Sequence, residues 1–170
     1  MSIHAPEEPL SSRNLVITRD AETVSLHYEI PWSMTLGSKS HEKDLRRRFK
    51  ARLQRWLPVN IHDAGNVISA TWIAKDLENV RSAVQYLDHM LEGFRKERLI
   101  PKIVEEALGI SSVERKRWIK DGRLSTSGAG HFLKGKTRFQ FSMHAPDDIA
   151  RIAANPEIIS AWRQQDGEPS

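Results

Sequence analysis

The stretch PKIVEEALGISSVERKRWIKDGRL, residues 101–124, predicts two short helices joined by a tight turn. Pro101 suits the first turn of a helix, where its missing N–H has no partner to lose. Gly109 follows the last apolar position of the first helix and can end it in a left-handed conformation without a side-chain penalty. Ser111 and Glu114 fit a capping box at the start of the second helix. We therefore expect a helix-turn-helix whose second helix stops at Asp121.

The same stretch resembles a known family of DNA-binding domains. The runs Leu108-Gly109-Ile110-Ser111 and Trp118-Ile119-Lys120-Asp121-Gly122-Arg123-Leu124 are similar to those of the MerR-like and phage-excisionase-like winged helix. The resemblance covers residues 100–155 and implies a winged helix-turn-helix whose second helix lies in the major groove. One position departs from the family pattern, because Arg115 stands three residues before the tryptophan, where the family usually has an apolar residue. Val113 supplies that contact instead if the helix is rotated or starts later.

Basic and polar residues of the second helix and of the following hairpin are the candidates for DNA contact. The hairpin is predicted over residues 131–143 with a turn at Gly135-Lys136, and in a winged helix it would be the wing. Lysine and arginine contact phosphates and base edges, and we expect Lys116 and Arg117 to face solvent. The candidate DNA-binding residues are Ser111, Ser112, Glu114, Arg115, Lys116, Arg117, Lys120, Arg123, Lys134, Lys136 and Arg138.

A second basic helix is predicted from Ser40 to Leu57, where Pro58 ends it. Leu45, Phe49, Leu53 and Trp56 form its expected buried stripe. Its cations are candidates for a secondary nucleic-acid contact: Arg46, Arg47, Arg48, Lys50, Arg52 and Arg55. A basic helix face can equally be a solvated surface with no partner.

Alternating apolar residues predict antiparallel strands in the N-terminal half. Val24, Leu26, Tyr28 and Ile30 alternate with polar residues, and Ile68, Ala70 and Trp72 do the same after a turn at residues 63–66. Leu15–Thr18 and Val59–Ile61 are the other two expected strands, and Pro31–Ser40 is expected to be a loop. Asp20-Ala21, Val24 and Ile30 recur 43 residues later as Asp63-Ala64, Val67 and Ile73. If this echo is real, the chain contains a duplicated hairpin-plus-helix unit.

The helix predicted over residues 76–98 has the most regular apolar pattern. Its seam residues fall at alternating spacings of three and four: Leu77, Val80, Val84, Leu87, Leu91 and Phe94. Such a seam packs on a sheet of the same chain or on its copy in a second chain. The predicted fold class is therefore α+β, with an N-terminal ββαββα antiparallel sheet followed by a winged helix-turn-helix.

The expected domain organisation follows from these patterns. Residues 1–12, rich in proline, glutamate and serine, form a disordered lead-in. Residues 13–99 form the α+β domain, which serves in dimerisation, sensing or nucleic-acid contact. Residues 100–165 form the winged helix-turn-helix, and residues 166–170 form a tail.

The amino-acid composition and the missing motifs exclude several kinds of functional site. The 170 residues include 26 Lys and Arg, 22 Asp and Glu, and no cysteine, which excludes disulfides, thiolate catalysis and cysteine-based zinc sites. The sequence lacks a phosphate-cradling glycine loop and a serine-nucleophile motif, so we expect no enzymatic activity, cofactor or metal. An apolar run long enough to span a bilayer is missing too, and we expect a cytoplasmic, nucleoid-associated protein without a membrane partner.

Two functions fit these observations. The first is a DNA-binding protein, either a transcriptional regulator or a recombination or plasmid accessory factor, which binds double-stranded DNA as a homodimer formed through its N-terminal domain. The second is a non-catalytic subunit of a larger nucleoprotein or multiprotein complex. In that complex the chain would contact other protein subunits and bind RNA or DNA without sequence preference.

Overall fold

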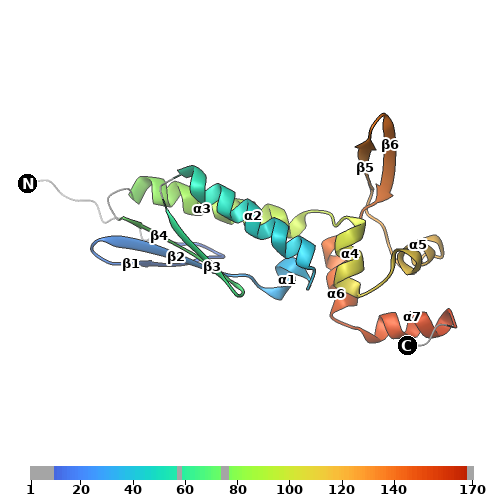
Figure 1. The fold of residues 1–170 in the computed structure, drawn as a ribbon. Coiled ribbons are helices and arrows are strands. Elements are labelled where there is room, and N and C mark those ends of the chain that lie inside the picture. Colours follow the sequence, from blue (N-terminus) through green and yellow to red (C-terminus); the bar gives the residue numbers. More distant parts are fainter. Residues whose placement is uncertain (1–9, 57–58, 74–76, 168–170) are drawn as a thin grey trace, which may run out of the picture. The chain divides into compact units, whose positions relative to one another are not determined.

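The computed structural model describes residues 10–56, 59–73 and 77–167 of the chain. It confirms the α+β class, with a four-stranded antiparallel sheet near the N-terminus followed by helices (Figure 1). The chain divides into two compact units, Met1–Ile30 with Arg46–Glu92 and Pro31–Leu45 with Gly93–Ser170. The sequence placed the boundary after residue 99, whereas residues 31–45 and 93–99 group with the C-terminal elements.

The sheet of the first unit consists of two hairpins. Strand β1 (Val16–Arg19) pairs with β2 (Thr23–Glu29), and β3 (Asn60–Ala64) pairs with β4 (Val67–Ile73). The strand order is β1-β2-β4-β3, and every pair is antiparallel. The two central strands are paired along their whole length, from Thr23 opposite Ile73 to Glu29 opposite Val67.

One face of this sheet is buried, as the alternation predicts. Val24, Leu26 and Tyr28 are buried in β2, and Ile68, Ala70 and Trp72 are buried in β4. These equivalent positions are 44 residues apart, whereas the echo in the sequence has an offset of 43. Because successive strand residues point to opposite faces, a difference of one residue inverts the orientation. The echo therefore does not mark structurally equivalent positions.

Two long helices cover the buried face of the sheet. They are α2 (Lys39–Trp56) and α3 (Leu77–Lys96), of which residues 46–56 and 77–92 belong to the first unit (Figure 1). The predicted stripe of α2 is buried at Leu45, Phe49 and Leu53, and the side chain of Trp56 lies outside the described residues. The seam of α3 is also buried, with Leu87 only 1% exposed. Since this burial occurs within a single chain, the seam packs inside the chain and is closed to a second copy.

Two predicted irregular segments contain ordered structure. In the expected loop Pro31–Ser40, Trp32–Thr35 forms a short helix, α1, which ends at Leu36 with a left-handed φ of 53°. In the expected disordered lead-in, residues 1–9 lie outside the described residues, but Ser12 is fixed. Its Oγ donates to Asp88 Oδ1 at 2.8 Å and accepts from the backbone N–H of Leu15 at 2.9 Å.

The second unit contains the predicted helix pair and hairpin. Its elements are α4 (Pro101–Leu108), α5 (Ser112–Lys120), β5 (Ala129–Lys134), β6 (Thr137–Ser142), α6 (Pro146–Ala153) and α7 (Glu157–Gln165). Buried apolar residues join the helices into one core: Leu36, Leu99, Val104, Leu108, Ile110, Trp118, Leu124, Ile149, Ile152 and Ile159. The β5–β6 hairpin projects away from these helices (Figure 1). Among the described residues, no helix combines the length and apolar character needed to cross a bilayer.

Candidate nucleic-acid interface

The turn between α4 and α5 has the caps that the sequence predicts. Gly109 ends α4 in a left-handed conformation with φ of 62°. The Ser111 Oγ accepts from the backbone N–H of Glu114 at 3.2 Å, and the backbone N–H of Ser111 donates to Glu114 Oε2 at 2.7 Å. This capping box fixes the start of α5. It also occupies both side chains, so Ser111 serves the fold of the helix.

Glu114 is a structural residue and not the base contact that the sequence suggested. Its side chain is buried, and its second carboxylate oxygen, Oε1, accepts from Arg163 Nε of α7 at 2.7 Å. The hydrogen bond from Arg163 lowers the pKa of Glu114 to about 2. Arg163 Nη2 also donates to the carbonyl oxygen of Gly109 at 2.9 Å. The pair therefore fastens α7 to the turn of the helix pair.

Arg115 is also removed from the set of candidate DNA contacts. It is 7% exposed, and its Nε donates to Glu105 Oε1 of α4 at 2.8 Å. Arg115 therefore takes the inward position three residues before Trp118, where the resemblance implies an apolar side chain. The alternative of a rotated helix is wrong, because Val113 is 63% exposed.

Asp166 fixes the end of α5, although the sequence predicts it to be part of the tail. Its Oδ2 accepts from Arg117 Nη1 at 2.9 Å and from Trp118 Nε1 at 2.8 Å, and its Oδ1 accepts from Arg123 Nη2 at 2.6 Å. The hydrogen bond from Arg123 is the main cause that lowers the pKa of Asp166 to about 2. Arg123 also pairs with Asp121 at 2.6 Å.

Two of the predicted DNA contacts, Arg117 and Arg123, therefore have structural partners within the second unit. The side chain of Arg123 is 19% exposed, and that of Arg117 is 39% exposed. Both hold α7 against α5, so Arg117 does not simply face solvent as expected. Local sequence patterns carry no sign of this cluster, since its partners lie more than 40 residues apart in the chain.

The remaining candidates, Ser112 and five cations, are exposed. On α5, Ser112, Lys116 and Lys120 are spaced by four residues, which places them on one face of the helix. On the hairpin, Lys134, Lys136 and Arg138 are exposed as well. Within the part of the chain that the structure describes, none of these five cations forms an ion pair. We call Lys116, Lys120, Lys134, Lys136 and Arg138 the free cation set.

The hairpin presents hydrogen-bonding groups on one of its faces. His131 lies opposite Gln140 in the register of β5 and β6. Together with Arg138, Ala129 and Gly130 they line a pocket of about 440 Å³. Imidazole, amide and guanidinium groups are the types that read base edges and phosphates.

The secondary cluster on α2 is largely engaged within the first unit. Arg46 donates to the Asp63 carboxylate and to the Gly65 carbonyl oxygen, and Lys50 Nζ lies 2.7 Å from Asp63 Oδ2. The hydrogen bond from Lys50 is the largest of the effects that lower the pKa of Asp63. Arg52 stacks over the ring of Tyr86 at 5.0 Å.

The other three candidate arginines of α2 are Arg47, Arg48 and Arg55. Arg47 and Arg48 also have partners in the chain, and Arg55 is exposed. Most of the candidate cations on α2 therefore have partners within the chain, which weakens the case for a nucleic-acid contact there.

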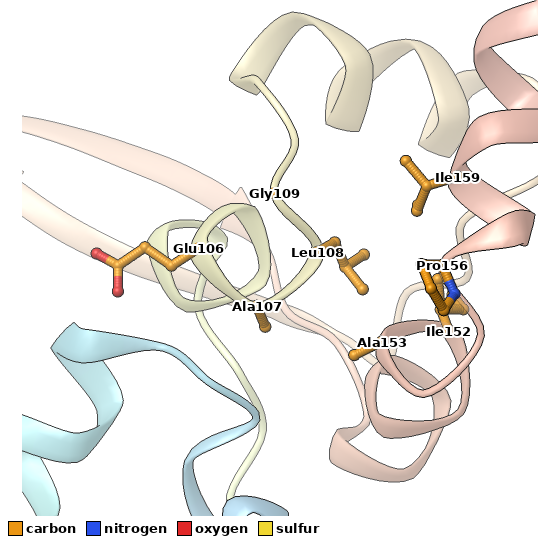
Figure 2. A pocket seen from close by; sticks show the side chains of 8 residues that line it. All are labelled: Glu106, Ala107, Leu108, Gly109, Ile152, Ala153, Pro156 and Ile159. Carbon is orange, nitrogen blue, oxygen red and sulfur yellow. The ribbon is translucent and has the colours of Figure 1, made fainter. Parts of the chain in front are cut away.

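A separate pocket of about 330 Å³ lies among α4, α6 and the start of α7 (Figure 2). Leu108, Ile152 and Ile159 contribute apolar side chains, whereas the carboxylate of Glu106 points away from them. Ser38 and Ser40 donate to that carboxylate at 2.7 and 2.6 Å. Apart from Glu106, the side chains that line the pocket are therefore apolar. Among the described residues, no cluster of three or more His, Asp or Glu could hold a metal ion.

Comparison of the chain with family models, curated proteins and solved structures finds no match. The resemblance of residues 100–155 to the MerR-like and excisionase-like winged helix therefore stays a prediction.

Proposed function

We propose that the chain is a DNA-binding protein that contacts the duplex through α5 and the β5–β6 hairpin. The observation that carries the proposal is the separation of cations in the second unit. Arg115, Arg117, Arg123 and Arg163 are held by carboxylates, whereas the free cation set is exposed to solvent and has no carboxylate partner among the described residues. Cations without internal partners are those that can neutralise phosphates.

The rigidity of α5 supports this role. The capping box fixes its first turn, the Arg115–Glu105 pair ties its middle to α4, and Asp166 ties its end to α7. A helix held at its start, middle and end presents Ser112, Lys116 and Lys120 in a fixed arrangement. Pre-organised side chains lose less conformational entropy on binding.

The charge of the hairpin supports the same partner. None of the 22 residues from Ser125 to Pro146 is acidic, so no carboxylate of this segment opposes a phosphate. In a winged helix the hairpin contacts the backbone beside the groove that the second helix enters. The lysines of β5 and its turn would then hold the backbone, while Lys116 and Lys120 would contact base edges or flanking phosphates.

The finer biological assignment is also a proposal. A regulator and a recombination or plasmid accessory factor both need sequence-specific duplex binding, and a homodimer would double the length of DNA that is read. The alternative, an assembly subunit that binds nucleic acid without sequence preference, relies on α2, whose cations are mostly paired. A cytoplasmic, nucleoid-associated location would follow from the first assignment.

The test is selection of bound sequences from a random duplex library at about 150 mM salt, a physiological ionic strength. We expect an enriched motif, and an inverted repeat within it would indicate a dimer. A library that stays random, with equal affinity for all duplexes, would contradict sequence-specific binding and favour the assembly subunit. A Lys116→Ala/Lys120→Ala variant run in parallel should lose the enrichment.

A further inference from the structure

We propose that the β5–β6 hairpin binds unpaired nucleic-acid bases by stacking them on an aromatic face formed by Phe132, Phe139 and Phe141. The inference rests on the proposed function and deepens it, since it assigns a substrate class to the same hairpin. The preferred substrate would be DNA with exposed bases, such as a bulge, a fork or a single strand. A fully paired duplex would use only the cations.

The aromatic face is a product of the strand register. Phe132 lies opposite Phe139, and Gly130 lies opposite Phe141, and residues that are opposite each other share a face. The rings of Phe132 and Phe139 are stacked, with centroids 5.2 Å apart and planes inclined by 14°. The Phe141 ring lies 6.3 Å from that of Phe132.

Gly130 is required for this arrangement. A Cβ atom at residue 130 would lie 2.5 Å from two carbons of the Phe141 ring, a distance at which the ring would have to move. Glycine at residue 130 thus lets the ring of Phe141 lie close against β5. The two outer rings extend the face toward the tip of the hairpin.

The outer rings are exposed to solvent. Phe132 is 52% exposed and Phe139 is 42% exposed, on a hairpin that projects from the helices of its unit (Figure 1). These rings contribute little to a core, because every residue from 131 to 140 is exposed. Exposed clusters of large apolar side chains mark interaction sites. The hairpin therefore needs a partner with flat apolar surfaces.

The positive charge of the hairpin favours nucleic acid over other partners that have flat apolar surfaces. Lys134 follows Phe132 by two residues and so shares its face, about 7 Å further along the strand, and Lys136 lies in the turn. A base stacked on Phe132 would bring its phosphate toward these cations. A second copy of the hairpin would bring like charges together, which is unfavourable. Insertion into a bilayer is also disfavoured, because Lys134 and Lys136 at the turn would have to enter it with their charges.

Stacking predicts a preference for unpaired bases. In a duplex the faces of the bases are covered by their neighbours, whereas a bulge or single strand exposes them. Stacking of a base on an aromatic side chain is tolerant of sequence and changes affinity by about tenfold or more. Arg138 and Gln140 lie on the other face of β6 from Phe139 and Phe141 by the alternation of the strand, so they can contact the backbone independently.

The experiment measures affinity by fluorescence anisotropy for three probes of one sequence. The probes are a blunt duplex of about 20 base pairs, two helical turns, the same duplex with an unpaired bulge containing 2-aminopurine, and the single strand. We expect the wild type to bind the bulged duplex about tenfold more tightly than the blunt one. The 2-aminopurine fluorescence should be quenched on binding.

The variant is Phe132→Leu/Phe139→Leu, which removes both rings and keeps an apolar surface. It should lose the preference for the bulge and the quenching, while its affinity for the blunt duplex stays unchanged. The matched control is Leu133→Ala, because Leu133 is 69% exposed on the opposite face of the same strand. Melting curves equal to wild type establish that each variant folds, and the single change Phe132→Leu provides a milder test.

The outcomes separate the two proposals. Blunt and bulged duplexes bound equally tightly would overturn base stacking and leave duplex binding intact. A preference for unpaired bases that persists while Lys116→Ala/Lys120→Ala leaves the affinity for the blunt duplex unchanged would support stacking and contradict the role of α5. A preference that survives in the double phenylalanine variant would overturn the assignment of the rings. Binding to anionic vesicles in place of all three probes, lost in that variant, would identify a membrane surface and overturn it as well.

Discussion

The steepness of the salt dependence of duplex binding follows from the number of free cations. Each phosphate neutralised on B-DNA contributes about −0.9 to the slope of log K against log salt concentration. If all five cations of the free cation set contact phosphate, the slope is about −4.5. A rise from 50 to 200 mM salt, a fourfold change, would then weaken binding by about 500-fold.

Replacing Lys116 and Lys120 with alanine leaves three of the five cations. The slope should fall to about −2.7, and the same rise in salt should weaken binding by only about 40-fold. The stability of the fold should not change, because both side chains are exposed and lack ion pairs among the described residues.

The assay is anisotropy of a labelled duplex titrated at five salt concentrations. The control is Lys43→Ala/Lys96→Ala, which removes the same charge from exposed positions of α2 and α3 and should keep the wild-type slope. An unchanged slope in Lys116→Ala/Lys120→Ala would refute the assignment of α5 as a phosphate-contacting helix. Equal reductions in both variants would show that only net charge matters.

Three further changes test the packing. Leu87→Asp buries a charge in the seam of α3 and should destabilise the first unit by more than about 3 kcal/mol in urea unfolding, while Leu87→Met should stay near wild type; a stable Asp variant would contradict the seam. Arg115→Met combined with Glu105→Leu should leave duplex affinity within about twofold, because Arg115 faces Glu105 and not the duplex, and replacing both members of a buried ion pair with apolar side chains is tolerated; a large loss in a variant that melts like wild type would restore Arg115 as a DNA contact. Burial lowers the pKa of His144, so near pH 6.5 the unfolded chain binds a proton that the folded chain does not bind. The free energy of unfolding should therefore be highest above about pH 6.5 and should decrease below it by at most about 1.4 kcal/mol per pH unit. A His144→Gln variant should lack this dependence between pH 5 and 6.5, and an identical pH profile would exclude His144 as its source.

The elements of the second unit were predictable because their signals are local. Pro101, Gly109 and the pair Ser111 with Glu114 mark helix boundaries within a few residues of each other, and the structure has α4 and α5 at those positions. The sheet was predictable for the same reason, because alternation in β2 and β4 indicates which face is buried. The prediction of a loop at Pro31–Ser40 was wrong in part, because Trp32–Thr35 is helical. This helix ends at the buried Leu36, in a left-handed conformation that the residue type does not suggest.

The roles of individual side chains were less predictable, because they depend on distant partners. Arg115 belongs to a basic run, and only the nearby carboxylate of Glu105 explains its inward position. Arg163 lies in α7 and Asp166 directly follows it, in a stretch without a recognisable motif, yet they engage Glu114, Arg117 and Arg123. The sequence shows how many cations the chain has, whereas contacts between its helices decide which of them can bind phosphate.

The most direct test of the central claim is lysine footprinting, in which mass spectrometry measures the acetylation rate of each lysine with and without bound duplex. We expect protection of Lys116, Lys120, Lys134 and Lys136, with Lys43 and Lys96 acetylated at unchanged rates. Unchanged rates at all four lysines of α5 and the hairpin, or protection confined to lysines of α2, would contradict it.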